Sequence, residues 1–241
     1  MNVAIGESDA PIPDQLSVDN VEVTVVPGGV RIDCAVAIGS SATHVQLYHS
    51  TTTTLNPASN KSGGRVAVDA GRPITLYAGD ITRRNLLTDG TFDSASGWTM
   101  DPGWSVTVGR AQHVSGDAGR IGRMMSLATA TTYRLSWSML SGGGFHVSNR
   151  ARAELTGGLS TAAGPWRSAS GRYTERLIAS GSPNALAIYA ESSFAGSVDD
   201  ISIYAETAGC LPVGTNYFWI EPINADGQPG PMIGPFSATI E

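Results

Sequence analysis

Short runs in which apolar and polar residues alternate recur along this chain, separated by turn signals rich in Gly and Pro. Residues 21–25 form one such run, and residues 30–36 form another directly after the turn signal Pro27-Gly28-Gly29. A period of two places every second side chain on the same face of a strand, so this pair predicts a β-hairpin with one buried face. No segment keeps a helical period over three turns. The pattern predicts an all-β protein of the sandwich type.

Further alternating runs predict strands at residues 45–48, 74–77, 105–108, 133–137, 186–189 and 201–204. The chain has 241 residues, of which 41% are hydrophobic, and this is enough for one large domain or two ordinary domains. No apolar run reaches the roughly 18 residues of a membrane span. The N-terminus lacks the basic and apolar regions of a secretory signal. We therefore expect no membrane insertion.

The charge balance and the cysteine content exclude further classes of protein. The chain has 15 basic and 21 acidic residues and a net charge of −6. Nucleic-acid binding needs a basic surface, so we expect no nucleic-acid partner. Cys34 and Cys210 are too few for a disulfide framework or a cysteine-based zinc site. A single bridge between them is one alternative, and two buried thiols are the alternative that we favour.

The composition changes near Thr82 and again near Thr207. The segment between them contains 11 Arg, 10 acidic residues and four of the five Trp, whereas the rest of the chain is strongly acidic. We interpret residues 83–207 as a domain inserted into a second, discontinuous domain formed by residues 20–82 and 208–241. Residues 1–19 show no convincing pattern, and we expect them to form an N-terminal arm that either docks on other proteins or is a disordered tail.

The two outer segments resemble a fibronectin type III domain. Residues 211–217, Leu-Pro-Val-Gly-Thr-Asn-Tyr, are similar to the tyrosine-corner segment of that family, and residues 218–227 look like its next strand and the turn after it. The resemblance implies that Tyr217 hydrogen-bonds back to nearby backbone. It also implies a fibronectin type III-like (Ig-like) sandwich, with the insertion in the connection between strands E and F.

Residues 83–207 resemble a different family, the jelly-roll carbohydrate-binding modules. The opening of these modules is similar to residues 85–93, Asn-Leu-Leu-Thr-Asp-Gly-Thr-Phe-Asp, and their closing strand is similar to residues 196–203. Residues 132–137 match the central core strand. Compact modules of this kind, paired with fibronectin-type domains, are typical of virion proteins of tailed phages and of related gene-transfer particles. The resemblance implies an inserted jelly-roll β-sandwich that binds carbohydrate, in a virion protein assembled in the host cytoplasm.

The sequence does not predict an enzyme. Its four His form no metal-binding pair at helical spacing, and no Gly-x-Ser-x-Gly nucleophile elbow is present. Asp199 and Asp200 are neighbours on a predicted strand, so we expect their side chains on opposite faces. Glycoside hydrolysis needs two carboxylates that face each other across the scissile bond, which this pair would not supply.

The acidic residues of the inserted segment have a different role in the resembling modules. There, an acid after the first-strand Phe and an acid in the final strand often share a structural calcium ion with backbone carbonyls. The matching positions are Asp93 and either Asp199 or Asp200, so the resemblance implies a structural Ca²⁺ as a cofactor. Oxygen ligands from both ends of a domain would suit such a hard cation. The alternative is that Asp93 caps a turn and the other acids accept bonds from backbone amides.

Three tryptophans of the inserted segment have the sequence environment of core residues. Trp137 shares a face with Tyr133 and Leu135 by the period of two, and Trp104 shares a face with Val106. Trp98 follows the opening segment of the resembling modules. We therefore expect Trp98, Trp104 and Trp137 to pack in a core.

Trp166 differs, because residues 164–168, Gly-Pro-Trp-Arg-Ser, form a predicted loop with polar neighbours. An aromatic ring there can stack on the apolar face of a sugar while Arg167 binds hydroxyls or an acidic group. A second candidate edge lies just after the triple glycine at residues 142–144. The predicted carbohydrate-binding residues are therefore Trp166, Arg167, Phe145, His146, Arg150 and Arg152. The alternative for each is a local hydrophobic plug or a solvated arginine.

Two functions from different classes remain. In the first, the chain is a fibre, head-spike or tail-tip protein that binds host cell-surface polysaccharide, with other virion proteins as partners and a homo-oligomeric state. The arginines of the inserted segment favour an anionic polysaccharide. In the second, the chain is a structural virion assembly or decoration protein without a ligand. An accessory module of a bacterial enzyme is disfavoured, because the sequence has no catalytic set.

Overall fold

The computed structural model describes residues 17–107, 109–142, 149–157, 160–182 and 184–241. These residues form 17 β-strands and no helix, so the predicted all-β class is confirmed. The runs predicted from alternation coincide with strands, as far as the described residues reach. No membrane-spanning helix is found in the described part of the chain. The predicted site residues Phe145 and His146 lie outside the described residues, as does most of the N-terminal arm.

The chain divides into two compact units. The first contains the residues up to Thr82 together with Gly209–Ile240, and we call it the outer unit. The second contains Arg83–Ala208, and we call it the inserted unit. In the sequence, the inserted unit therefore interrupts the outer unit once.

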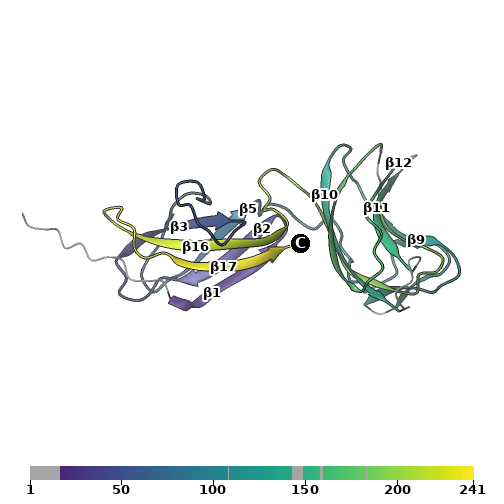
Figure 1. The fold of residues 1–241 in the computed structure, drawn as a ribbon, viewed down its shortest axis with the longest axis horizontal. Coiled ribbons are helices and arrows are strands. Elements are labelled where there is room, and N and C mark those ends of the chain that lie inside the picture. Colours follow the sequence, from purple (N-terminus) through teal and green to yellow (C-terminus); the bar gives the residue numbers. More distant parts are fainter. Residues whose placement is uncertain (1–16, 108, 143–148, 158–159, 183) are drawn as a thin grey trace, which may run out of the picture. The chain divides into compact units, whose positions relative to one another are not determined.

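The outer unit is a sandwich of two antiparallel sheets (Figure 1). One sheet has the order β1 (Ser17–Val26), β2 (Gly29–Ala35) and β5 (Pro73–Gly79). The other has the order β17 (Ile233–Ile240), β16 (Gly214–Asn224), β3 (Ala42–Ser50) and β4 (Val66–Ala67). The predicted hairpin is the β1–β2 pair, in which Val25 lies opposite Val30. Side chains of both sheets, among them Ile32, Leu76 and Phe218, share one buried core.

A buried asparagine occupies the corner at which β16 begins. The Asn216 side chain is fully buried, and its amide nitrogen donates to the backbone oxygens of Pro212 at 2.9 Å and Gly214 at 2.8 Å. Its Oδ1 lies 2.7 Å from Nε2 of His49 on β3. The hydrogen bond to upstream backbone that the sequence assigned to Tyr217 is therefore made by its neighbour. Tyr217 is on the opposite side of the strand, where its ring contacts Trp219.

Cys34 and Cys210 form no disulfide bond, so the single-bridge alternative does not apply, and the expectation of two buried thiols holds for Cys34 only. Cys34 is buried in the core of the outer unit, whereas Cys210 is partly exposed. Burial raises the pKa of the Cys34 thiol to about 11. Cys34 is therefore a packed, unreactive core residue.

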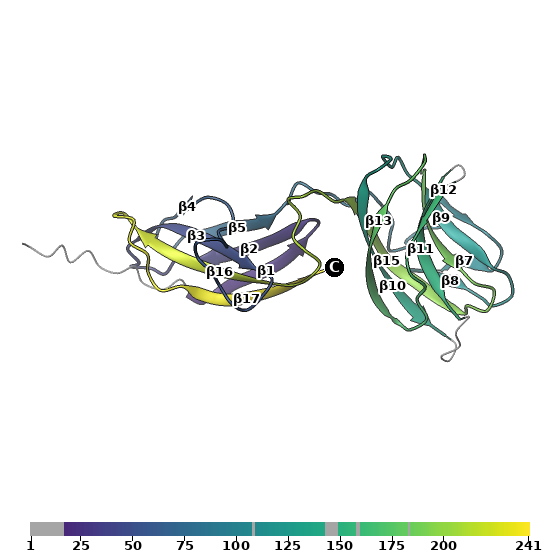
Figure 2. The same ribbon diagram turned by 45° about the horizontal axis from the view of Figure 1, so that its top comes forward.

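The inserted unit consists of two five-stranded antiparallel sheets (Figure 2). The first has the order β13 (Gly171–Ile178), β10 (Thr132–Ser141), β15 (Gly196–Ala205), β8 (Arg110–His113) and β7 (Trp104–Thr107). The second has the order β12 (Ser160–Ala163), β11 (Ala151–Gly157), β14 (Ala185–Ala190), β9 (Gly119–Met124) and β6 (Trp98–Met100). Neighbours within a sheet are mostly distant in the sequence, so the sheets join residues that the chain separates widely.

The core of the inserted unit lies between its two sheets. Trp137, Leu135 and Ile188 have no exposed surface, and the ring of Phe92 lies 4.5 Å from that of Trp98. Trp104 is also buried. The prediction that Trp98, Trp104 and Trp137 are core residues is confirmed. The outward face of each sheet is thus left for polar side chains and for any ligand.

Candidate functional site

Three side chains form a row on the outward face of the second sheet. Arg152 on β11 pairs with Tyr189 on β14, and Tyr189 pairs with Arg120 on β9. The next row, Ala153, Ile188 and Ile121, is buried in the core. Because side chains alternate along a strand, the first row must face away from the core.

Trp166 extends this row beyond β11. The backbone of Arg167 pairs with that of Ala151, which brings the loop alongside the start of β11. The Trp166 ring centroid lies 4.6 Å from Cζ of Arg150 and 4.4 Å from Cζ of Arg152. The ring centroids of Trp166 and Tyr189 are 5.7 Å apart. Cζ of Arg120 lies 4.8 Å from the centroid of the Tyr189 ring. We call the cluster of Trp166, Tyr189, Arg120, Arg150 and Arg152 the aromatic–arginine platform.

Two glutamates hold the guanidinium groups of the platform. Glu154, with no exposed surface, accepts from Nε of Arg120 at 2.8 Å through one oxygen and from Arg152 at 2.8 Å through the other. Glu191 accepts two bonds of 2.8 Å from Arg150, and these bonds raise the pKa of Arg150. The two bonds that Arg150 and Arg152 each make fix both the position and the orientation of these planar guanidinium groups.

This arrangement determines what the platform can offer a ligand. Each guanidinium carries five N–H donors, and these glutamates use only some of them. The remaining donors have a fixed direction beside two aromatic rings. The positive charges are largely balanced by Glu154 and Glu191, so hydrogen bonding and ring contact outweigh net charge.

A groove of about 340 Å³ continues from the platform along the same sheet face. Small residues of β9 and β14, namely Gly122, Ala185 and Ala187, line it, with Thr99, Thr156 and Asn184 as polar neighbours. Arg120 belongs both to the groove and to the platform. Platform and groove therefore form one continuous surface that a ligand can follow.

The structure brings together three of the predicted carbohydrate-binding residues, Trp166, Arg150 and Arg152. Sequence reasoning missed Tyr189 and Arg120. The signal for Tyr189 was present, since in the run 186–189 it alternates with the core residues Leu186 and Ile188. That Arg120 lies beside it follows only from the pairing of β9 with β14.

Arg167, by contrast, does not join the platform. Its Nε donates to Oε1 of Glu175 at 3.1 Å, and its Cζ lies 4.7 Å from the ring centroid of Tyr173. Glu175 is 2% exposed, and a Cβ at Gly164 would lie only 1.8 Å from its Oε2. Trp166 and Arg167 are adjacent in an extended segment and point to opposite sides. The prediction that both contact one sugar is therefore wrong in its geometry, because Arg167 neutralises a buried carboxylate.

The three candidate calcium ligands lie on the first sheet and the loop before β6. A bulge in β15, with Asp200 at a φ of 50°, puts an extra residue opposite β10. Asp199 pairs with Ser138, and Ser138 also donates to Asp200, so both acids are on the outward face. The expectation that they point to opposite faces is wrong, because the bulge interrupts the alternation. Burial raises the pKa of the Asp199 carboxyl, and the neighbouring acids add to this rise.

These acids already have partners within the protein. Asp93 accepts from the Thr91 hydroxyl, and Asp199 accepts from the backbone N–H of Asp200. Asp93 and Asp200 line one cavity of about 430 Å³. Across the described ranges, no group of three or more His, Cys, Asp or Glu has a metal-binding arrangement. A cation here would have two carboxylates at most and would otherwise depend on backbone oxygens.

Comparisons with known proteins found solved structures that align with about half of this chain. No family model matches the sequence, and no curated protein matches it. A Family 16 carbohydrate-binding module aligns with 49% of this chain and 99% of its own length, at 14% identity and a TM-score of 0.35. The N-terminal cellulose-binding domain of Cellulomonas fimi β-1,4-glucanase C covers 50% of this chain and 96% of its own, at 18% identity and a TM-score of 0.38. The enzymatically active domain of tailspike protein 4 from bacteriophage CBA120 aligns with 51% of this chain and 21% of its own length, at 9% identity and a TM-score of 0.36. At these levels of similarity, a function for this chain must be derived from its own side chains.

Proposed function

We propose that this chain is a non-enzymatic virion surface protein that binds a host polysaccharide through the outward face of β11, β14 and β9. The observation that carries the proposal is the combination, on one sheet face, of the aromatic–arginine platform and the adjoining groove. Carbohydrate sites combine ring surfaces with a few fixed polar groups, and this face has both.

Each part of the face matches one property of a sugar. Tyr189 and Trp166 offer apolar ring surface for a pyranose face, while Arg120 and Arg152 offer N–H donors for hydroxyls. The donors are held in advance by Glu154, which lowers the entropic cost of binding. From Tyr189 to Ala185 the strand runs about 13 Å. A ligand that uses platform and groove together is therefore a chain of several sugars rather than a single one.

The virion role completes the proposal. A site of this kind is weak by itself, and several copies on one particle would raise the effective affinity by about 10²–10⁴. A closed homo-oligomer would supply those copies. In this arrangement the outer unit contacts other virion proteins and the inserted unit carries the glycan site. The alternative function, a structural virion protein, predicts that the purified chain binds no glycan.

Replacing Tyr189 by alanine should weaken glycan binding roughly tenfold while leaving the fold intact, because a stacked ring contributes about 1 kcal/mol beyond its buried area. The measurement begins with a glycan array on the full chain and continues with calorimetric titration of the best glycan into wild type and Tyr189→Ala. The matched control is Tyr77→Ala, since Tyr77 is an exposed tyrosine of the outer unit. Absence of any bound glycan would favour the structural alternative, and equal affinity of Tyr189→Ala would move the site elsewhere.

We also propose that a calcium ion bridges Asp93 and the β15 bulge. The acids that line the cavity there support this, because a divalent cation would relieve their mutual repulsion. Calcium in excess should raise the melting temperature of the inserted unit relative to EDTA, by an amount that grows with concentration. Asp93→Asn should abolish that rise. Identical melting curves in calcium and in EDTA would mean that the acids only accept protein hydrogen bonds.

A further inference from the structure

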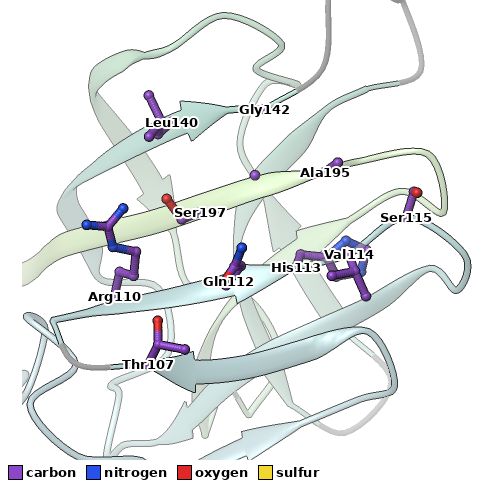
Figure 3. A pocket seen from close by; sticks show the side chains of 11 residues that line it. Thr107, Arg110, Gln112, His113, Val114, Ser115, Leu140, Gly142, Ala195 and Ser197 are labelled. Carbon is purple, nitrogen blue, oxygen red and sulfur yellow. The ribbon is translucent and has the colours of Figure 1, made fainter.

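A second cavity, of about 550 Å³, lies on the other sheet of the inserted unit (Figure 3). Leu140 on β10, Ser197 on β15 and Gln112 on β8 line it and lie in one cross-strand row. Because Val198 and Ala111 are buried in the core, this row faces outward. The aromatic–arginine platform belongs to the opposite sheet, so the two surfaces share no residue.

Arg110 sets this cavity apart from the rest of the unit. Arg120, Arg150 and Arg167 each form an ion pair with a glutamate, and further arginines of the unit do the same. Arg110 forms no ion pair or hydrogen bond with any described residue, and it lines the cavity. Asp199 forms no ion pair with Arg110. The positive charge of Arg110 nevertheless opposes the rise in the pKa of the Asp199 carboxyl. The guanidinium therefore has its full set of donors available.

The hydroxyl of a largely buried serine gives a second, independent indication. Ser197 is 8% exposed, and no described residue hydrogen-bonds to its side chain. Figure 3 shows its hydroxyl and the Arg110 guanidinium on the cavity side of the sheet. A hydroxyl that lines a cavity and has no protein partner can donate to and accept from a ligand that enters there. Exposed apolar side chains, Leu140 at 55% and Val114 at 58%, border these polar groups.

We propose that this cavity is a second binding site, which takes a sugar carrying a carboxylate. The fork of Arg110 matches a carboxylate in two parallel hydrogen bonds. Gln112 and Ser197 both donate and accept, as sugar hydroxyls require. Leu140 and Val114 offer apolar contact to a ring face. An extended peptide is a poorer fit, since peptides add to a free strand edge and β8 is paired on both sides.

The site does not depend on the platform, and a matched pair of sugars tests it directly. D-glucuronate and D-glucose, which differ in the carboxylate at C6, are titrated separately into the ¹⁵N-labelled full chain and followed by NMR. Glucuronate should give saturable shifts for the amides of residues 110–115 and 195–198, with at least tenfold weaker binding of glucose. Raising the salt concentration should weaken the glucuronate response.

Two variants separate this site from a general charge effect. Arg110→Gln should weaken glucuronate binding at least tenfold, and Ser197→Ala should weaken it to a smaller extent. Arg72→Gln removes the same charge from an exposed position of the outer unit and should change nothing. Arg110 is exposed and makes no contact that folding requires, so the spectrum of its variant should retain the native dispersion. Equal responses to both sugars, unchanged binding by Arg110→Gln, or shifts confined to the platform would each overturn the proposal.

Discussion

Replacing Arg167 by methionine is expected to destabilise the inserted unit by about 3–4 kcal/mol at pH 7. The substitution leaves Glu175 buried without its cationic partner, which typically costs about 3–5 kcal/mol. Burial already raises the pKa of Glu175, and Arg167 is the main group that opposes the rise. The Glu175 carboxyl of the variant can avoid a buried, unpaired charge by taking up a proton. Protonating a glutamate with an ordinary pKa near 4.3 costs about 4 kcal/mol at pH 7. This cost is the upper limit for the loss of stability caused by Arg167→Met.

The loss of stability should depend on pH in a defined direction. A carboxyl whose folded-state pKa is raised binds a proton more readily when folded, so the penalty is full above that pKa and fades as the pH falls toward the unfolded value. At pH 5 the upper limit for the loss of stability falls to roughly 1 kcal/mol. Urea unfolding followed by tryptophan fluorescence measures this, because four of the five Trp belong to the inserted unit.

A double variant is the control for this prediction. Arg167→Met combined with Glu175→Leu removes both charges and should regain most of the lost stability, because an apolar pair of similar volume is often as stable as a buried ion pair. Arg167→Met with wild-type stability at pH 7, or with a loss independent of pH, would contradict the assignment. The same result bears on glycan binding, since an Arg167 variant that fails to bind would do so through unfolding rather than through a lost ligand contact.

Alternation alone predicted eight of the 17 strands among the described residues, and part of the core. Trp137 and Leu135 share a face by the period of two, and both are fully buried. This signal is reliable because it depends on neighbours within one strand. It also separates Trp166 from Arg167, which as successive residues of an extended segment point to opposite sides. Two residues that are adjacent in an extended segment therefore do not form one binding unit.

The candidate site required information that no single segment contains. Arg152, Tyr189 and Arg120 meet because β14 lies between β11 and β9, and this pairing is a property of the whole sheet. The same limit applies at Asp200, where a bulge interrupts the local alternation. Such a bulge depends on how the partner strand is paired, which the composition of β15 does not reveal.

Replacing Asn216 by alanine should destabilise the outer unit by about 2–4 kcal/mol, because it removes three hydrogen bonds that each contribute about 0.5–1.5 kcal/mol. The groups that lose a bond are the backbone oxygens of Pro212 and Gly214 and the imidazole of His49, and each of the three bonds is partly buried. Some of the loss will be recovered by water that enters the vacated space. Scanning calorimetry of the full chain measures the effect on the transition of the outer unit.

The adjacent residue provides the matched control. Within the described part of the chain, the Tyr217 hydroxyl has no hydrogen-bond partner, and the ring contacts Trp219. Tyr217→Phe keeps that ring contact and should change the stability by less than about 0.5 kcal/mol. A tyrosine corner would give the reverse order, with Tyr217→Phe costly and Asn216→Ala mild. The relative loss of stability in the two variants therefore decides which side chain hydrogen-bonds β16 to the backbone before it. The geometry at Asn216 predicts that this side chain is the asparagine.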